Sequence, residues 1–341
     1  MPTSAKCHIS RAGTCHSAPE TTVFSRFSTY VVAGLLAAAA GTSQAFPDKT
    51  ITIIVPFSAG TTTDVNARDF VQLLSVAVRQ PVVIDNRVGA EGTLGGLALI
   101  NAAADGHTLM FTSSSLPVLD PLMKKNLPYD PVKDFAPVCA VGRTSNVMNI
   151  TGSSSMKTVA DVIAAAKAEP GKLTFGYASA TMRLAGELFQ QAAGVRFTSV
   201  PYRSSVTALT DLASGQIDLV FIDHVSAAPF YQSGKVRPIA VSGAQRFKAL
   251  PDVPSATEVG VPGYLVLPWL GIFMSAKTPP AIVTQVREAV ANAMSQPVMA
   301  ANLDKRGLIP FTLCGDALGK HVLDEMAHWR PVLDKAGIEP Q

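Results

Sequence analysis

Short segments rich in β-branched residues alternate with amphipathic segments of helical period along most of this chain. Strand-like runs occur at 50–55, 81–84, 108–112, 135–141, 173–177, 197–200, 219–223 and 237–241, and helical patterns follow most of them. This alternation predicts parallel strands joined by crossover helices, which is an α/β fold. In open sheets of this class, ligands bind beyond the carboxyl ends of the strands. The loops that follow such ends, at 58–63, 113–115, 178–183 and 203–205, would converge if two lobes faced each other.

The first strand and the helix after it predict a place to hold an anion. The strand breaks at Pro56, and small residues lead into a helix that begins with three threonines, at 61–63. A helix N-terminus presents unpaired backbone N–H groups and the positive end of the helix dipole. Small residues before it let a carboxylate or phosphate approach closely. The candidate ligand-binding residues of this turn are therefore Phe57, Ser58, Ala59, Gly60, Thr61 and Thr62.

Residues 1–45 have the pattern of an export signal. Arg26 precedes an apolar run at 30–40, and small residues follow at the positions that signal peptidase requires. We expect cleavage before Phe46 and a periplasmic location. The apolar run is too short for a stable membrane anchor. The stretch before Arg26 is long for a leader, which is compatible with a start codon downstream of Met1.

Composition argues against several classes of function. Lys and Arg number 28 against 25 Asp and Glu, a formal net charge of +3 that is too balanced to predict binding of nucleic acid or an anionic membrane. The chain shows no nucleophile elbow, no zinc-protease motif and no P-loop, and its histidines lack the spacing of a zinc site. The glycines at 89–96 are wrongly spaced for a dinucleotide loop. We therefore expect no catalytic residue, no cofactor and no metal, but binding without chemistry.

Two of the four cysteines, Cys139 and Cys314, lie beyond the predicted leader. They are far apart in sequence, and the predicted compartment is one in which disulfides persist. We favour two buried free thiols over a bridge, although the residues alone leave both arrangements open.

Many short motifs occur in one order along the rest of the chain. They include Val55-Pro-Phe-Ser-Ala-Gly60, Pro81-Val-Val-Ile-Asp-Asn-Arg-Val-Gly89, Asn126-Leu-Pro-Tyr-Asp-Pro-Val-Lys-Asp-Phe-Ala-Pro-Val138, Leu184-Ala-Gly-Glu-Leu-Phe189, Val200-Pro-Tyr-Arg203 and Leu250-Pro-Asp-Val-Pro254. With these motifs the chain resembles the tripartite tricarboxylate transporter substrate-binding proteins, the Bug-type periplasmic receptors. The resemblance covers essentially all of the chain after the leader.

The resemblance implies a two-lobed α/β fold of the periplasmic-binding-protein kind, a type II-like Venus flytrap with a ligand cleft between the lobes. Lobe 1 would comprise residues 46–146 and 268–341, and lobe 2 residues 147–267. It implies a receptor that closes around a small mono-, di- or tricarboxylate by hinge motion and delivers it to membrane transporter subunits. The family's first loop, which corresponds to 57–62 here, holds the ligand carboxylate. We expect a monomer that binds no nucleic acid.

The remaining candidate residues are polar side chains in loops that should border the cleft: Ser113, Ser114, Ser179, Thr181, Arg183, Arg203, Ser204 and Asp223. A guanidinium matches a carboxylate bidentately, so Arg183 and Arg203 either bind the ligand or lie on the surface. Asp223, at a strand end, either accepts a hydrogen bond from the ligand or caps the next segment. Several of these loops depart from the family pattern, so we place ligand selectivity in lobe 2.

Two alternatives for the function stay open. The same binding fold could serve as the input to a membrane sensor kinase instead of a transporter. A different class, a secreted hydrolase that uses the same cleft, would require a catalytic constellation that no motif in the sequence supports. The sequence names neither the ligand nor the partner that receives it.

Overall fold

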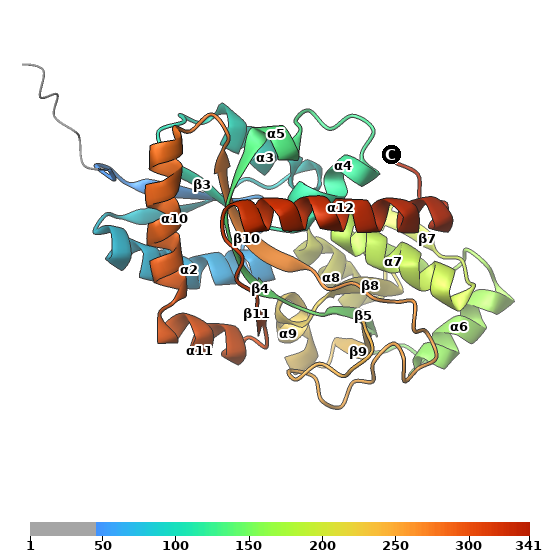
Figure 1. Ribbon diagram of the computed structural model, residues 1–341. Coiled ribbons are helices and arrows are strands. Elements are labelled where there is room, and N and C mark those ends of the chain that lie inside the picture. Colours follow the sequence, from blue (N-terminus) through green and yellow to red (C-terminus); the bar gives the residue numbers. More distant parts are fainter. Residues whose placement is uncertain (1–45) are drawn as a thin grey trace, which may run out of the picture. The chain divides into compact units, whose positions relative to one another are not determined.

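Two β-sheets organise the part of the chain that the computed structural model describes, residues 46–341 (Figure 1). The predicted leader, residues 1–45, lies outside the described residues. Within the described part, no helix combines the length and the apolar character needed to cross a membrane.

The first sheet has six strands in the order β11-β4-β10-β3-β1-β2. Strand β1 lies between β2 and β3 and is parallel to both. The chain therefore adds β2 on one side of β1 and then crosses over to add β3 on the other side. Strands β10 and β11 come from the C-terminal part of the chain. Strand β10 pairs antiparallel with β3 and β4, and β11 pairs antiparallel with β4. The strands are β1 (Ile51–Val55), β2 (Val82–Asn86), β3 (Thr108–Ser113), β4 (Phe135–Arg143), β10 (Trp269–Ser275) and β11 (Ile309–Pro310).

Helices cover both faces of the first sheet because side chains alternate along each strand. Val55 of β1 packs in one cluster with Phe70 of α2, whereas Ile54 packs in another with Leu99 of α3. Helices α10 and α11 lie beside α2. The helices and helical turns of this half are α2 (Thr62–Val78), η1 (Ala90–Gly92), α3 (Thr93–Asn101), η2 (Ser115–Leu119), α4 (Asp120–Met123), α5 (Pro131–Asp134), α10 (Pro280–Met294) and α11 (Pro297–Lys305).

The second sheet has five strands in the order β7-β6-β8-β5-β9. Strand β6 lies between β7 and β8 and is parallel to both, so β6 occupies the same topological position here as β1 does in the first sheet. The elements are β5 (Asn146–Thr151), α6 (Val159–Ala168), β6 (Thr174–Tyr177), α7 (Ala180–Ala193), β7 (Thr198–Pro201), α8 (Ser205–Ser214), β8 (Leu219–Asp223), α9 (His224–Gln232) and β9 (Val236–Val241).

Helix α7 packs very closely on the second sheet. A Cβ atom added at Gly186 of α7 would lie 2.5 Å from the ring of Phe175 on β6. The missing side chain at Gly186 therefore sets how near the helix can approach the strand.

The chain crosses between the two sheets twice. Thr144 and Ser145 join β4 to β5, and a longer segment joins β9 to β10. Strand β5 and helices α9 and α11 are elements that the sequence pattern did not predict. The lobe boundaries that follow residues 146 and 267 stay a proposal.

The last helix, α12 (Asp316–Ala336), and the tail after it contact elements of both halves. Helix α12 packs on β4 and η2 and also touches α7. Past its end, the N–H of Lys125 donates to the carbonyl of Gln341 at 2.9 Å. Arg183 of α7 donates from Nη2 to the carbonyl of Glu339 at 3.1 Å. The side chain of Arg183 thus ties α7 to the C-terminal tail.

Cys139 and Cys314 form a disulfide, with Cα atoms 4.0 Å apart and a sequence separation of 175. The expectation of two free thiols is therefore wrong. Cys139 lies on β4, and Cys314 lies just before α12, in a segment that returns alongside β4 and forms an isolated bridge with it. This return brings together two positions that are distant in sequence.

Candidate ligand-binding site

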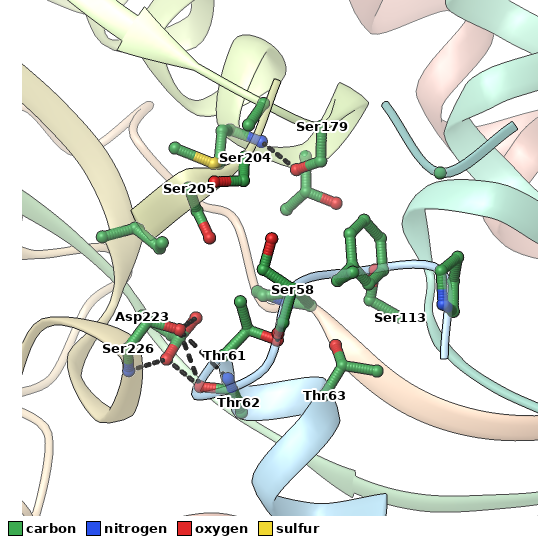
Figure 2. A pocket seen from close by; sticks show the side chains of 18 of the residues that line it. Ser58, Thr61, Thr62, Thr63, Ser113, Ser179, Ser204, Ser205, Asp223 and Ser226 are labelled. Atoms are coloured by element: carbon green, nitrogen blue, oxygen red, sulfur yellow. Dashed lines mark hydrogen bonds between the residues drawn. The ribbon is translucent and has the colours of Figure 1, made fainter. Parts of the chain in front are cut away.

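A pocket opens between the two sheets and takes its lining from both (Figure 2). Its walls come from the residues after β1 and β3 in the first half, from those after β6, β7 and β8 in the second, and from both crossings. The lining residues are Pro56, Phe57, Ser58, Thr61, Thr62, Thr63, Val88, Gly89, Gly92, Ser113, Thr144, Asn146, Ala178, Ser179, Thr181, Met182, Arg203, Ser204, Ser205, Ile222, Asp223, Ser226, Pro268 and Leu270.

The topology of the two sheets explains the position of the pocket. Ligands of open α/β sheets bind beyond the carboxyl ends of the strands, at the point where consecutive strands are added on opposite sides of one strand. That strand is β1 in the first sheet and β6 in the second. Helix α2 starts after β1 and helix α7 after β6, and the first residues of both helices line the pocket. The pocket therefore lies between two equivalent helix N-termini.

The turn before α2 uses part of its hydrogen-bond donors internally. The N–H of Gly60 donates to the carboxylate of Asp64 at 2.9 Å. The N–H of Thr61 donates to the carbonyl of Ser58 at 3.3 Å. Thr61 caps the helix, and its hydroxyl accepts from the N–H of Asp64 at 3.4 Å. Two of the backbone N–H groups that the sequence offers to an anion are thus engaged within the turn itself.

Asp64 is a buried carboxylate in the first turn of α2, and its side chain is 2% exposed. Arg68 holds it through two hydrogen bonds of 3.0 Å, and Asn86 donates to it at 2.9 Å. Burial alone would raise the pKa of Asp64, but the hydrogen bonds from Arg68, Asn86 and Gly60 outweigh it and lower the pKa. A negative charge therefore already occupies this helix N-terminus and complements its dipole.

Thr62, Asp223 and Ser226 connect the two halves across one side of the pocket, and we call these three residues the clasp (Figure 2). The N–H of Thr62 donates to the hydroxyl of Ser226 at 3.1 Å, and the hydroxyl of Thr62 donates to the carboxylate of Asp223. Asp223 also caps α9 by accepting from the N–H of Ser226 at 2.9 Å. The clasp thus joins the N-terminus of α2 to that of α9, and Asp223 has the capping role that was one of its two predicted roles.

The N-terminus of α7 is organised differently. Ser179 caps it, accepting from the N–H of Met182 at 3.3 Å. The hydroxyl of Thr181 is fully enclosed and has no partner among the described residues, although Thr181 lines the pocket and is only 7% exposed. The backbone N–H groups of Ala180 and Thr181 also lack acceptors in the described part of the chain. No acidic residue lies in the first turn of α7.

Few ionisable groups line the pocket. Arg203 is the one basic residue in the lining, and it makes no hydrogen bond or ion pair with any described residue. Asp223 is the one acidic residue. His224, next to Asp223, is buried, and burial lowers its pKa, which keeps the ring neutral near pH 7. Among residues 46–341, no group of His, Cys, Asp and Glu side chains is arranged to hold a metal ion.

The structure brings most of the predicted site residues together. Those that line the pocket are Phe57, Ser58, Thr61, Thr62, Ser113, Ser179, Thr181, Arg203, Ser204 and Asp223. Those that do not are Ala59, Gly60, Ser114 and Arg183.

Each residue outside the lining has a structural explanation. Gly60, with φ 83°, forms the turn before α2, and Ala59 lies in the same turn. The backbone N–H of Ser114 donates to the carbonyl of Trp269 at 2.8 Å, in the packing between β3 and β10. Arg183 points to the C-terminal tail, where Glu339 accepts its hydrogen bond.

Sequence reasoning missed several polar residues of the lining. Thr144 lies in the short crossing between β4 and β5, and Asn146 is the first residue of β5, where the sequence indicated a hinge and gave no sign of a pocket wall. Asn146 is fixed there because its Oδ1 accepts from the hydroxyl of Tyr264 at 2.7 Å. Ser226 could have been found, because it stands three residues after the helix cap Asp223.

Comparisons with known proteins agree with this geometry. The sequence profile of the tripartite tricarboxylate transporter family receptors matches residues 67–338. The Bordetella pertussis protein BugT is 30% identical, over 90% of this chain and 97% of BugT.

Solved structures are similar as well. Rpa4515 of Rhodopseudomonas palustris, solved with adipate, has 34% identity and a TM-score of 0.82 over 87% of this chain and 100% of its own. MatC of the same species, solved with bound malate, has 29% identity and a TM-score of 0.79 over 84% of this chain and 100% of its own. The expected two-lobed α/β fold of a periplasmic binding protein is thereby confirmed.

Proposed function

Because this chain belongs to the tripartite tricarboxylate transporter family of receptors, we propose that it is a periplasmic solute-binding protein for a small organic carboxylate. It would deliver that solute to the membrane subunits of a tripartite transporter. The similarity to structures that hold adipate and malate supports a carboxylate as the ligand.

The observation that carries this proposal is the composition of the pocket between the two helix N-termini. Hydroxyl groups from both halves face it, and its one basic side chain, Arg203, has no partner among the described residues. Apolar residues such as Phe57, Met182 and Leu270 complete the wall. Hydroxyl and guanidinium donors together with this apolar surface suit a carboxylate attached to a short carbon chain.

We further propose that the pocket binds its ligand without chemistry. Its lining contains no histidine, lysine, cysteine or glutamate. Its one carboxylate, Asp223, is engaged in the clasp and as the cap of α9. Ser226 donates to this carboxylate, but the lining offers no histidine or lysine to act as the general base for a serine. The expected result is that the bound carboxylate is recovered unchanged by NMR after prolonged incubation with the protein.

Ligand binding is tested by a thermal-shift screen of carboxylates from acetate to adipate, malate included, followed by calorimetry of the strongest binder. A ligand that binds only the folded state raises the melting temperature by mass action. If no carboxylate shifts the melting temperature and neutral solutes do, the proposed ligand class is wrong. Arg203→Ala is expected to weaken binding of the dicarboxylates most, since a guanidinium can pair with a second carboxylate.

The cellular part of the proposal needs separate tests. Cell fractionation should place the protein in the periplasm, without residues 1–45. Deletion of the membrane subunits should abolish uptake of the labelled ligand while leaving ligand binding by the purified protein intact. If uptake persists but a transcriptional response is lost when the receptor is deleted, the protein serves sensing and not transport.

A further inference from the structure

We propose that the C-terminal segment 337–341 is a strap that holds the two halves closed over the pocket. Helix α12 leads into the strap from the first half, Gln341 returns to the first half, and Arg183 of the second half binds the strap in between. The proposal concerns the closing movement of a two-lobed fold, so it does not depend on the identity of the ligand.

The start of the strap is fixed to the first half. Just before α12, Cys314 is bonded to Cys139 of β4, and α12 packs on β4 and η2. Gly337, with φ 65°, ends the helix, and the N–H of Ile338 donates to the carbonyl of Leu333 at 3.0 Å. Ile338 also packs against the apolar core, so the direction in which the chain leaves α12 is set.

The end of the strap is also fixed to the first half. The N–H of Gln341 donates to the carbonyl of Met123 at 3.0 Å, and its carbonyl accepts from the N–H of Lys125 at 2.9 Å. Between these two residues stands Lys124, whose ammonium donates to the carbonyl of Ala90 at 3.2 Å. Ala90 belongs to a turn whose two glycines line the pocket. The end of the strap is therefore connected to the pocket wall that the first half contributes.

Arg183 attaches the strap to the second half. Its side chain is 7% exposed, and its Nη2 donates to the carbonyl of Glu339 at 3.1 Å. Within residues 46–341 this carbonyl is the one acceptor of the guanidinium, and its Nε is enclosed without a partner. A buried charge with few partners is costly to deprive of the last one. Thr181 and Met182, just before Arg183, line the pocket, so one turn of α7 contributes both the strap contact and part of the pocket wall.

Opening of the cleft has to break this attachment. Helix α7 packs on β6 and β8, so it moves with the second sheet when the halves separate. Either Arg183 then loses the carbonyl of Glu339, or the strap is pulled away from Met123 and Lys125. A hydrogen bond to a charged group that exists in the closed form and is lost on opening raises the ratio of closed to open molecules by about tenfold to 150-fold.

The experiment removes the strap contact from either side. One variant ends the chain after Ile338, and the other is Arg183→Met, which keeps an unbranched apolar stem but has no donor. Spin labels at the exposed positions Val76 of α2 and Lys172 before β6 report the separation of the halves without ligand. Both variants should show a larger fraction of long distances than the wild type. Combining them should open the halves no further than the truncation alone, because both remove the same contact.

Arg237→Met is the matched control. Arg237 of β9 also donates to backbone carbonyls, those of Gly152 and Met156, but both acceptors lie in the second half. This variant loses the same kind of hydrogen bond without touching the strap, so its distance distribution should equal that of the wild type. If Arg237→Met opens the halves as much as Arg183→Met does, the effect is a general loss of stability and the inference is wrong.

Hydrogen exchange reports the strap itself. The amide of Lys125, which donates to Gln341, should exchange faster in Arg183→Met than in the wild type and at the wild-type rate in Arg237→Met. Unchanged exchange together with an unchanged distance distribution in Arg183→Met would overturn the inference, and this variant decides the matter if the truncated chain does not fold. A screen in which no carboxylate binds refutes the proposed function, whereas these ligand-free measurements still test the strap.

Discussion

The substitution Thr62→Val tests whether the clasp holds the two halves together in the absence of ligand. Valine has the shape of threonine but removes the hydroxyl that donates to the carboxylate of Asp223. The backbone N–H of Thr62 can still donate to Ser226. Asp223 keeps its hydrogen bonds from Ser226, so the cap of α9 stays in place. The variant therefore removes the contacts of one hydroxyl across the two halves, with the carboxylate of Asp223 and the hydroxyl of Ser226, and little else.

The expected magnitude follows from the charge of the acceptor. A hydrogen bond to a charged group contributes about 1.5–3 kcal/mol, more than the roughly 1 kcal/mol of a neutral one. If the two halves separate when the cleft opens, the ratio of closed to open molecules should fall by about tenfold to 150-fold in Thr62→Val. The ligand should also dissociate faster, because the closed state is less populated.

Spin labels on the two halves can report the separation. Val76 on α2 is 79% exposed, and the side chain of Lys172, before β6, is 66% exposed, so both positions accept a label without disturbing a core. Electron-spin distance measurements without ligand should show a larger fraction of long distances in Thr62→Val than in the wild type.

Thr210→Val is the matched control, because the hydroxyl of Thr210 bonds only the carbonyl of Val206 within α8. If the distance distribution of Thr62→Val equals that of the wild type, or if Thr210→Val changes it equally, the clasp does not govern closure.

Three further predictions concern stability. Replacing Cys139 and Cys314 by serine should lower the free energy of unfolding by up to about 5 kcal/mol, given the separation of 175 residues, and an unchanged urea midpoint would contradict this. Burial raises the pKa of Asp120 to about 7, so this group stabilises the fold below its unfolded pKa and loses that contribution as the pH rises toward 7. From pH 4 to pH 7.5, the unfolding free energy of the wild type should therefore fall by up to about 4 kcal/mol more than that of Asp120→Asn. Equal pH profiles of the two proteins would refute this prediction. Gly186→Ala should cost about 1–3 kcal/mol in chemical denaturation because its Cβ would lie 2.5 Å from the ring of Phe175, and a neutral result would mean that α7 can shift.

The parts of the site that follow a strand directly were predictable from sequence. Ser58, Ser113 and Ser179 each follow a segment with a clear strand pattern, and all three line the pocket. Ser58 and Ser113 converge because they follow neighbouring parallel strands, β1 and β3, of the first sheet. Ser179 follows β6 in the second sheet and meets them because the two-lobed fold makes the two sheets face each other. Local pattern and fold class were sufficient for them.

Two features were not predictable in this way: where a side chain points, and whether a backbone N–H is already hydrogen-bonded to another residue. Arg183 lies only two residues after Thr181 in the same helix, yet it points to the C-terminal tail and Thr181 to the pocket. The N–H of Thr62 looked available in the sequence, but a residue 164 positions away, Ser226, accepts its hydrogen bond. The pairing of Cys139 with Cys314 depends likewise on where a distant segment returns. Such contacts depend on tertiary packing, which single-sequence patterns do not contain.

The position of β10 constrains the order in which the two sheets can form as the chain emerges N-terminus first. The first sheet needs Trp269–Ser275 between β3 and β4, so its middle is missing until most of the chain has emerged. The second sheet uses one continuous stretch, from Asn146 to Val241, and can pair its strands earlier. Because contacts between distant segments form slowly, β1, β2 and β3 would wait with an uncovered edge on β3. A chaperone that shields this edge should therefore matter most for folding until β10 arrives.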